Sequence, residues 1–457
     1  MTLVEFVPPT PHPLWKLCPQ MGIADVVVKV NPELTGLADP WRYETLAGIV
    51  GRLKDAGLNV VGLEGDPFDM TPIKEYGATE DFSHKEQEIQ ESFSSRKERK
   101  DRKDEFRTND NSSQITNSNV AFATGSLGVL ENMASTSILQ DSKTPSSDSN
   151  LNPANPVKDD AATLRETTLA HYRELLESMG KLGIKLLCYN FMVGKGWSRT
   201  GVREGRGGAK ATYFSLKELT PKESDGSANA SPIQNVGALA KTSDKSELKI
   251  SRDQVWANYE YFIKAVMPTA EKCGVRMALH PDDPCLDSLG GYARIFGSIE
   301  AYDRAYALYP SPSNAVTFCQ ANFKLMLGNG ERGTVLATKN AKSTKTLRPL
   351  RPLRQKIETL EDVARHFGKR IAFIHVRDVE GDKTDFTELF HDQGDTDQFA
   401  LMRTYRELGL DVPLRGDHVP EMAYDRMLTP EGTPGYFTLG RLFANGYLKA
   451  LLQIPFA

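Results

Sequence analysis

Five side chains with metal-binding or acid–base chemistry stand where the sequence predicts that buried strands end. They are His280, Cys319, His375, Asp417 and His418. In a barrel of parallel strands, the carboxyl ends of the strands meet on the face that carries the active site, so these groups are expected to converge. Imidazole and carboxylate donors suit manganese, iron, cobalt or zinc, and a thiolate disfavours magnesium or calcium. The sequence therefore predicts a divalent-metal site that could activate a substrate oxygen.

Each of these residues also has an ordinary structural interpretation. A single histidine at a strand end is commonly a hydrogen-bonded structural residue. Cys319, in the apolar run VTFC, could be a core cysteine, and Asp417 beside Gly416 could form a turn. Their coincidence argues for the metal site, because the chain has eight histidines and three of them end predicted strands.

The elements that would position these groups follow one repeated pattern. An amphipathic helix is followed by a glycine and then by a short apolar strand that ends in a polar residue. In residues 41–64, Leu46, Ile49 and Leu53 have helical spacing and the following strand ends at Glu64. The same order recurs in residues 169–190, 255–280, 360–378 and 402–418.

Further strands are predicted at residues 24–30, 315–319 and 446–453. Short apolar strands that alternate with helices indicate parallel β/α units. Eight such units favour a closed (β/α)₈ TIM barrel over an open doubly wound sheet. No GxGxxG motif follows the first strand, so dinucleotide binding lacks its main support.

Composition divides the chain into a barrel and its insertions. Residues 1–82 hold the start of the barrel with its first two strands. Residues 83–160 are interpreted as a disordered insertion, because they are polar and lack apolar periodicity. The rest of the barrel lies in residues 161–457, with irregular insertions near residues 221–249 and 328–354.

Composition also limits the partners and the compartment. Lys and Arg number 56 and Asp and Glu 60, a formal net charge of -4, which argues against wholesale binding to nucleic acid or a membrane surface. The chain has no run of 18 apolar residues, its start does not resemble a secretory signal, and its five cysteines make no disulfide framework. We expect a cytoplasmic protein that binds a small molecule, with the possibility of a homo-oligomer left open.

Eight segments, taken in order, resemble the mannonate dehydratase family. They are CYNFM (188–192), WSRT (197–200), HPDDP (280–284), Cys319, HVRD (375–378), FxExxHxxGD (386–395), DH (417–418) and PGYxxxGRL (434–442). HPDDP alone is moderately specific, whereas the ordered set is highly specific. The resemblance implies a xylose-isomerase-like barrel that converts D-mannonate to 2-dehydro-3-deoxy-D-gluconate and water in hexuronate catabolism, with Mn²⁺ or Fe²⁺ as the cofactor.

The resemblance also implies roles for individual residues. The metal ligands would be His280, Cys319, His375 and Asp417, and the acid/base candidates His418 and Tyr436. The C2 proton of a sugar acid lies beside a carboxylate and is very weakly acidic, so a divalent metal there would stabilise the negative charge that its removal builds. One side chain must take this proton and another must protonate the departing C3 hydroxyl.

Four further residues are candidates for holding the substrate. Asn190, Arg199 and Arg377 could bind the carboxylate or hydroxyls of a sugar acid, although Arg377 could equally form a structural salt bridge. His391 follows the strand predicted to end at His375 closely enough to reach the barrel mouth, and it could also be an exposed loop residue without a role.

Two other functions are compatible with these features. A metal-dependent sugar isomerase could use the same barrel, but such sites are rich in carboxylate ligands, and a Cys-His-His-Asp set argues against one. A catalytically inactive barrel could instead act as a binding protein through its charged insertion, because a fold does not fix a function.

Overall fold

The computed structural model describes residues 1–78, 156–194, 196–219, 248–328, 357–430 and 432–455. The predicted insertions at 83–160, 221–249 and 328–354 lie outside the described residues, apart from their ends. One of these ends belongs to a helix, since α6 (Pro156–Lys181) begins inside the first predicted insertion. The barrel unit consists of Met1–Thr79 together with Val157–Ala457.

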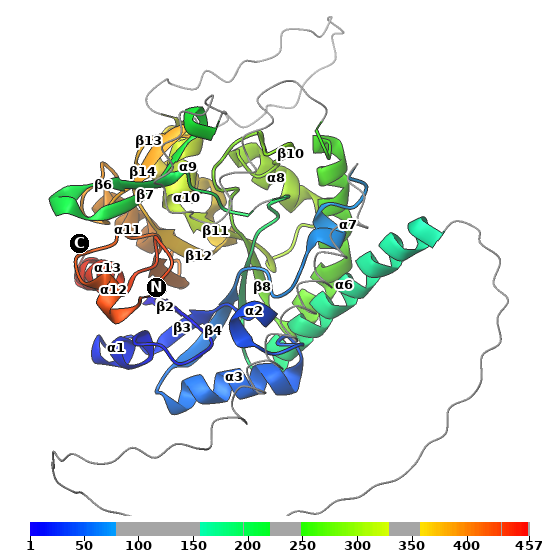
Figure 1. Ribbon diagram of the computed structural model, residues 1–457, viewed down its shortest axis with the longest axis horizontal. Coiled ribbons are helices and arrows are strands. Elements are labelled where there is room, and N and C mark those ends of the chain that lie inside the picture. Colours follow the sequence, from blue (N-terminus) through cyan, green and yellow to red (C-terminus); the bar gives the residue numbers. More distant parts are fainter. Residues whose placement is uncertain (79–155, 195, 220–247, 329–356, 431, 456–457) are drawn as a thin grey trace, which may run out of the picture. The chain divides into compact units, whose positions relative to one another are not determined.

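A parallel sheet closes into the barrel (Figure 1). Its strands are β1 (Thr2–Leu3), β2 (Glu5–Val7), β3 (Asp25–Val28), β4 (Asn59–Glu64), β5 (Leu186–Tyr189), β8 (Arg276–Leu279), β11 (Asn314–Cys319), β12 (Ile371–Val376) and β15 (Pro413–Gly416). They are arranged in the order β1-β15-β12-β11-β8-β5-β4-β3-β2.

The N-terminal strand closes this barrel. Val4 alone separates β1 from β2, so the two labels describe one strand that pairs on both sides. Leu3 is in register with Leu414 of β15, and Phe6 is in register with Val27 of β3. Counted in this way the barrel has eight strands, and the predicted (β/α)₈ fold is confirmed.

Helices cover the outside of the barrel and share a large apolar core with the outer faces of its strands. They are α1 (Leu14–Gln20), α3 (Tyr43–Asp55), α6, α7 (Arg252–Cys273), α8 (Ile299–Leu308), α9 (Gln320–Leu327), α10 (Leu360–Phe367), α11 (Gln398–Glu407) and α13 (Thr438–Gln453). Shorter helices are α2 (Pro32–Thr35), α4 (Thr71–Lys74) and α12 (Asp425–Leu428). In the part of the chain that is described, no helix combines the length and apolar character that crossing a bilayer requires.

Strand alternation produces a second, smaller core inside the barrel. On β8, Met277 belongs to the outer core and Ala278 to the inner one, because successive side chains point to opposite faces. His280 stands two residues after Ala278 and continues the inner row. His375 follows Phe373 on β12 in the same way. The carboxyl end of the barrel interior is therefore where the predicted metal donors must lie.

A second sheet joins the loops that follow the barrel strands. It is antiparallel, in the order β13-β14-β7-β6. Its strands are β6 (Gly201–Glu204), β7 (Lys210–Ser215), β13 (Val379–Asp382) and β14 (Asp385–Glu388), and a two-stranded ribbon consists of β9 (Ser288–Leu289) and β10 (Tyr292–Ala293). Because β7 pairs with both β6 and β14, it links Arg199, just before β6, to Glu388 at the end of β14.

One predicted strand is wrong. Residues 446–453 lie in α13, whose buried residues Ala444, Leu448 and Leu451 repeat at helical spacing. A short apolar run does not by itself distinguish a buried strand from the buried face of a helix. The strand that takes this place in the barrel is the N-terminal segment at residues 2–7, which the sequence analysis did not predict.

Replacing residues 83–155 with a Gly/Ser linker of about 15 residues should leave the barrel folded. The flanking segments are anchored independently, because Ile73 of α4 is 1% exposed and Leu169 of α6 is fully buried. Loop length by itself changes stability little, by about 0.6 kcal/mol for each doubling. We expect a thermal midpoint within about 2–4 °C of the parent, measured by scanning calorimetry. A variant recovered only as aggregate would contradict the prediction.

Candidate metal centre

The four predicted donor residues converge at the carboxyl end of the barrel interior. His280 follows β8, Cys319 ends β11, His375 lies in β12 and Asp417 follows β15. One potential ligand atom from each lies within 4.8 Å of all the others. Three of the residues are buried and His280 is partly exposed. The structure thus brings together side chains that are separated by up to 137 positions in the sequence.

The chemistry of these residues fits a divalent metal ion. The His375 ring is 1% exposed, yet neither of its nitrogen atoms has a hydrogen-bond partner. Unpaired polar atoms are costly to bury and therefore indicate an additional partner. With its proton on Nδ1, His280 donates to the Pro281 carbonyl at 2.8 Å, which leaves Nε2 to act as a ligand. Two imidazoles, a thiol and a carboxylate are donors that transition metals accept.

The two oxygen atoms of Asp417 have different surroundings. Oδ2 lies 3.7 Å from Nδ1 of His375, on the side of the other donors. Oδ1 accepts from the Tyr436 hydroxyl at 3.3 Å and lies 3.0 Å from Nη2 of Arg415. Burial alone would raise the pKa of Asp417, but His418 and Arg415 hold it well below its usual range. The carboxyl group is therefore an anion, as a metal ligand must be.

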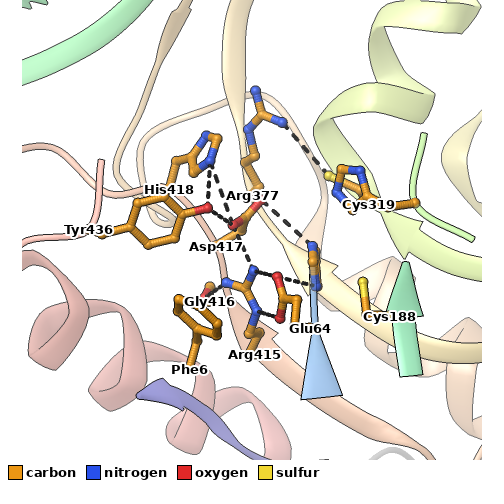
Figure 2. Close-up of polar contacts among 12 residues, drawn as sticks. Phe6, Glu64, Cys188, Cys319, Arg377, Arg415, Gly416, Asp417, His418 and Tyr436 are labelled. Carbon is orange, nitrogen blue, oxygen red and sulfur yellow. Dashed lines mark hydrogen bonds and ion pairs between the residues drawn. The ribbon is translucent and has the colours of Figure 1, made fainter. Parts of the chain in front are cut away.

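His418 and Tyr436 form a hydrogen-bonded pair beside this carboxylate (Figure 2). Nε2 of His418 and the Tyr436 hydroxyl are 2.9 Å apart. Burial and the nearby Asp417 raise the pKa of Tyr436 well above its usual range. The Trp197 ring covers the pair, with its centroid 5.2 Å from that of His418. Two groups that can exchange a proton therefore lie next to the metal donors.

A buried network of charges supports His418 from the other side. The guanidinium of Arg199 donates to Asp283 at 2.9 and 2.8 Å and to Glu388 at 2.7 Å. Arg377 donates to the same two carboxylates, at 2.9 and 2.8 Å. Burial raises the pKa of Glu388, but Arg377 and Arg199 outweigh it and lower the pKa to about 2. Oε1 of Glu388 lies 3.1 Å from Nδ1 of His418, so the network also orients this ring.

The predicted substrate residues differ in their surroundings. Both arginines, Arg199 and Arg377, are fully buried and paired with carboxylates, so the salt-bridge alternative for Arg377 is the one that the structure contains. Asn190 is partly exposed, and its Oδ1 accepts from Lys74 at 3.1 Å and from the Met192 amide at 3.1 Å.

The structure decides between the two locations considered for His391. The sequence placed it either at the barrel mouth or on an exposed loop. The side chain is buried, with 2% exposure, and Nε2 lies 2.7 Å from the carbonyl of Val376, the last residue of β12, so the exposed-loop alternative is wrong. The same carbonyl also accepts from the Asp417 amide at 2.9 Å, so the imidazole is anchored at the carboxyl end of β12, and a contact between His391 and substrate stays a prediction.

Several residues at the site were assigned no role by the sequence analysis. They are Glu64, Trp197, Asp283, Glu388 and Arg415. Three of them, Trp197, Asp283 and Glu388, belong to segments that carry the family resemblance. Arg415 stands two residues before Asp417, and this spacing places both side chains on one face of a strand. The sequence therefore singled out these positions, but it did not show which side chains they contact.

Glu388→Gln should destabilise the protein. The change leaves the buried guanidinium groups of Arg199 and Arg377 short of one negative charge, and breaking a buried ion pair costs about 3–5 kcal/mol. Urea unfolding at pH 7 measures this loss. Because the pKa of Glu388 is depressed from 4.5 to about 2, its contribution is present above pH 4.5 and disappears as the pH falls through about 2. The difference between parent and variant should shrink over the same interval.

Asp385→Asn provides the matched control, three positions earlier on β14. Asp385 pairs with Arg203 at 2.9 Å, and both side chains are more than a third exposed. Solvent weakens such a pair, so the expected loss is below about 1 kcal/mol. Equal losses in the two variants would contradict the importance of the buried network.

Comparison with known proteins connects this geometry to a family. The sequence profile of the family described as D-mannonate dehydratase (UxuA) matches residues 147–331 and 353–454. Mannonate dehydratase from Streptococcus equi subsp. zooepidemicus is 28% identical over 304 residues, which cover 63% of this chain and 74% of the relative. Mannonate dehydratase from Lachnoclostridium phytofermentans is 29% identical over 315 residues, with coverages of 63% and 76%.

A solved structure supports the fold. The crystal structure of mannonate dehydratase from Streptococcus suis serotype 2 superposes with a TM-score of 0.61, at 21% identity, and covers 99% of this chain and 93% of that one. The profile match includes all four metal-donor residues together with His418 and Tyr436, and it extends over more than half of the sequence. The chain therefore belongs to the D-mannonate dehydratase (UxuA) family.

Proposed function

We propose that this chain is a hydro-lyase that converts D-mannonate to 2-dehydro-3-deoxy-D-gluconate and water in hexuronate catabolism, and that it works in the cytoplasm. The observation that carries the proposal is the donor cluster at the barrel mouth beside the hydrogen-bonded pair of His418 and Tyr436, in a member of this family. Mn²⁺ or Fe²⁺ would suit the donors.

The side chains of the site divide into two groups by role. The ligands would be His280, Cys319, His375 and Asp417, and the ion they hold would supply Lewis-acid polarisation of the substrate carboxylate. His418 and Tyr436 would transfer protons. One of them accepts the proton from C2 and the other donates a proton to the departing C3 hydroxyl. Loss of water leaves an enol, which rearranges to the 2-keto acid.

The remaining residues would position these groups. Arg199 and Arg377 contribute by holding Glu388, which contacts His418, because both guanidinium groups are already paired. Asn190 stays a candidate for contacting a substrate hydroxyl, since it is partly exposed just beyond β5. Trp197 would limit access of water to the proton-transfer pair, because its ring lies over His418.

The direct test is turnover of D-mannonate by the purified full-length chain. The assay contains Mn²⁺ or Fe²⁺ under reducing conditions and follows formation of a 2-keto acid. Aldose isomerisation without formation of this acid would favour the sugar-isomerase alternative. Stoichiometric metal without turnover of either substrate class would favour a catalytically inactive binding protein.

Cys319→Ala should weaken metal binding by about 10-fold or more, since changes even in residues that only support metal ligands have effects of this size. Metal content after dialysis, measured by atomic emission, provides the readout. Cys18→Ala is the matched control, because Cys18 is also fully buried but lies in α1 and is absent from the donor clusters. Unchanged metal content in the Cys319 variant would remove this residue from the ligand set.

Tyr436→Phe should reduce turnover of D-mannonate by about 10²–10⁴-fold with metal content unchanged. The substitution removes the hydroxyl that bonds to His418 and preserves the ring. Tyr424→Phe is the control, because Tyr424 is 74% exposed and lies on the loop that leads to Tyr436. If the Tyr436 variant is as fast as the parent, its ring only packs over the site and His418 alone transfers protons.

A further inference from the structure

A buried ion pair lies inside the barrel against two of the proposed metal ligands. Glu64 ends β4 and Arg415 belongs to β15, and Nε of Arg415 donates to Oε2 of Glu64 at 3.0 Å. The Arg415 side chain is 2% exposed and that of Glu64 14%. Figure 2 shows the two side chains facing one another below Asp417. The roles proposed above use neither residue.

Each member of the pair reaches a different ligand. Nη2 of Arg415 lies 3.0 Å from Oδ1 of Asp417. Oε1 of Glu64 lies 3.6 Å from Nε2 of His375. The opposite atoms of the two ligands, Oδ2 of Asp417 and Nδ1 of His375, face one another at 3.7 Å on the side of the donor cluster.

We propose that the Arg415–Glu64 pair is a positioning device that selects Oδ2 of Asp417 and Nδ1 of His375 as the metal donors. The inference rests on the proposed function, because it assumes that these two residues hold a metal. Arg415 occupies the oxygen that does not bind the metal, and Glu64 faces the ring nitrogen that must keep its proton.

The lack of hydrogen bonds at His375 supports this arrangement. Both ring nitrogens are buried without a hydrogen-bond partner. Histidine ligands usually give their second N–H to a carboxylate, carbonyl or water, which fixes the tautomer and the ring orientation. Glu64 is such a carboxylate, and a shift of about 0.5 Å would bring its 3.6 Å separation into hydrogen-bond range. One nitrogen is then available to the metal and the other to Glu64.

A different role for Glu64 would be ligation of a second ion. Glu64, Cys188 and His375 also form a cluster with suitable donor atoms. Three hydrogen bonds argue against this role. Both oxygens of Glu64 already accept from Arg415, and Sγ of Cys188 accepts from the Thr317 hydroxyl at 3.3 Å. The positioning role keeps these contacts and adds only the small approach of Glu64 to His375.

The chain offers a matched control for the general stability of buried ion pairs. Glu5 on β2 pairs with Arg441 on α13, with a distance of 3.1 Å to Nε, and the two residues are 2% and 5% exposed. This second pair lies between the barrel and its outer helix and belongs to neither donor cluster. A purely structural role would make the two pairs equivalent.

The test compares Mn²⁺ affinity in three variants of the full-length chain: Glu64→Gln, Arg415→Lys and Glu5→Gln. Competition with a fluorescent chelator gives the dissociation constant, and urea unfolding gives the stability. We expect Mn²⁺ to bind about 10–100-fold more weakly in the first two variants and within about 2-fold of the parent in Glu5→Gln, even though Glu5→Gln loses stability. Arg415→Lys retains the positive charge, so a loss of Mn²⁺ affinity in this variant reports a change in the geometry of the pair. This variant also tests the proposal if Glu64→Gln does not fold.

A second readout follows the ligand atoms themselves. With Co²⁺ in place of Mn²⁺, the visible spectrum of Glu64→Gln should differ from that of the parent, whereas that of Glu5→Gln should not. Parent-like affinity in Glu64→Gln or Arg415→Lys, or equal losses in all three variants, would overturn the proposal. A stoichiometry of two metal ions per chain in the parent and one in Glu64→Gln would also overturn it, because Glu64 would then be a ligand of a second ion. A wrong assignment of the metal centre gives a different result. In that case His375→Ala would bind Mn²⁺ as tightly as the parent.

Discussion

Closure of the barrel is the constraint on which the rest of the site depends. In the strand order, β4 and β15 lie near opposite ends of the sheet, with β12, β11, β8 and β5 between them. Five strand spacings of about 4.8 Å would hold these strands about 24 Å apart in a flat sheet. Glu64 and Arg415 nevertheless contact each other at 3.0 Å. This contact across the barrel is possible because residues 2–7 pair with β15 on one side and β3 on the other.

Closure also places charges where water cannot solvate them, so the charged groups must satisfy one another. At the mouth, Arg199 and Arg377 share Asp283 and Glu388, and each carboxylate contacts both guanidinium groups. Burying ions costs free energy that only close pairing offsets. The pairing extends to the candidate site because Glu388 also contacts His418. The same side chains therefore hold the second sheet to the barrel and orient the hydrogen-bonded pair of His418 and Tyr436.

Local patterns in the sequence predicted most of the barrel. Helix, glycine and strand recur in an order that short-range sterics and burial enforce, and α7 ends at a left-handed Gly274 as this pattern requires. The pattern predicted a strand at residues 446–453, where the apolar run belongs to a helix. It also missed the N-terminal strand, whose two short halves, β1 and β2, lie on either side of Val4 and precede the first repeated unit.

The candidate metal ligands could be predicted from the sequence, because strand ends and the alternation of side chains place His280, Cys319 and His375 on one inner face. The contacts of the charged residues could not be predicted in this way. Arg199 and Arg377 have the chemistry to bind a sugar acid, yet both are paired with buried carboxylates. Glu64 and Arg415 meet across 351 positions. Periodicity in the sequence reflects local backbone geometry and burial. These ion pairs, in contrast, form only when closure of the barrel brings both charged side chains together and removes them from water.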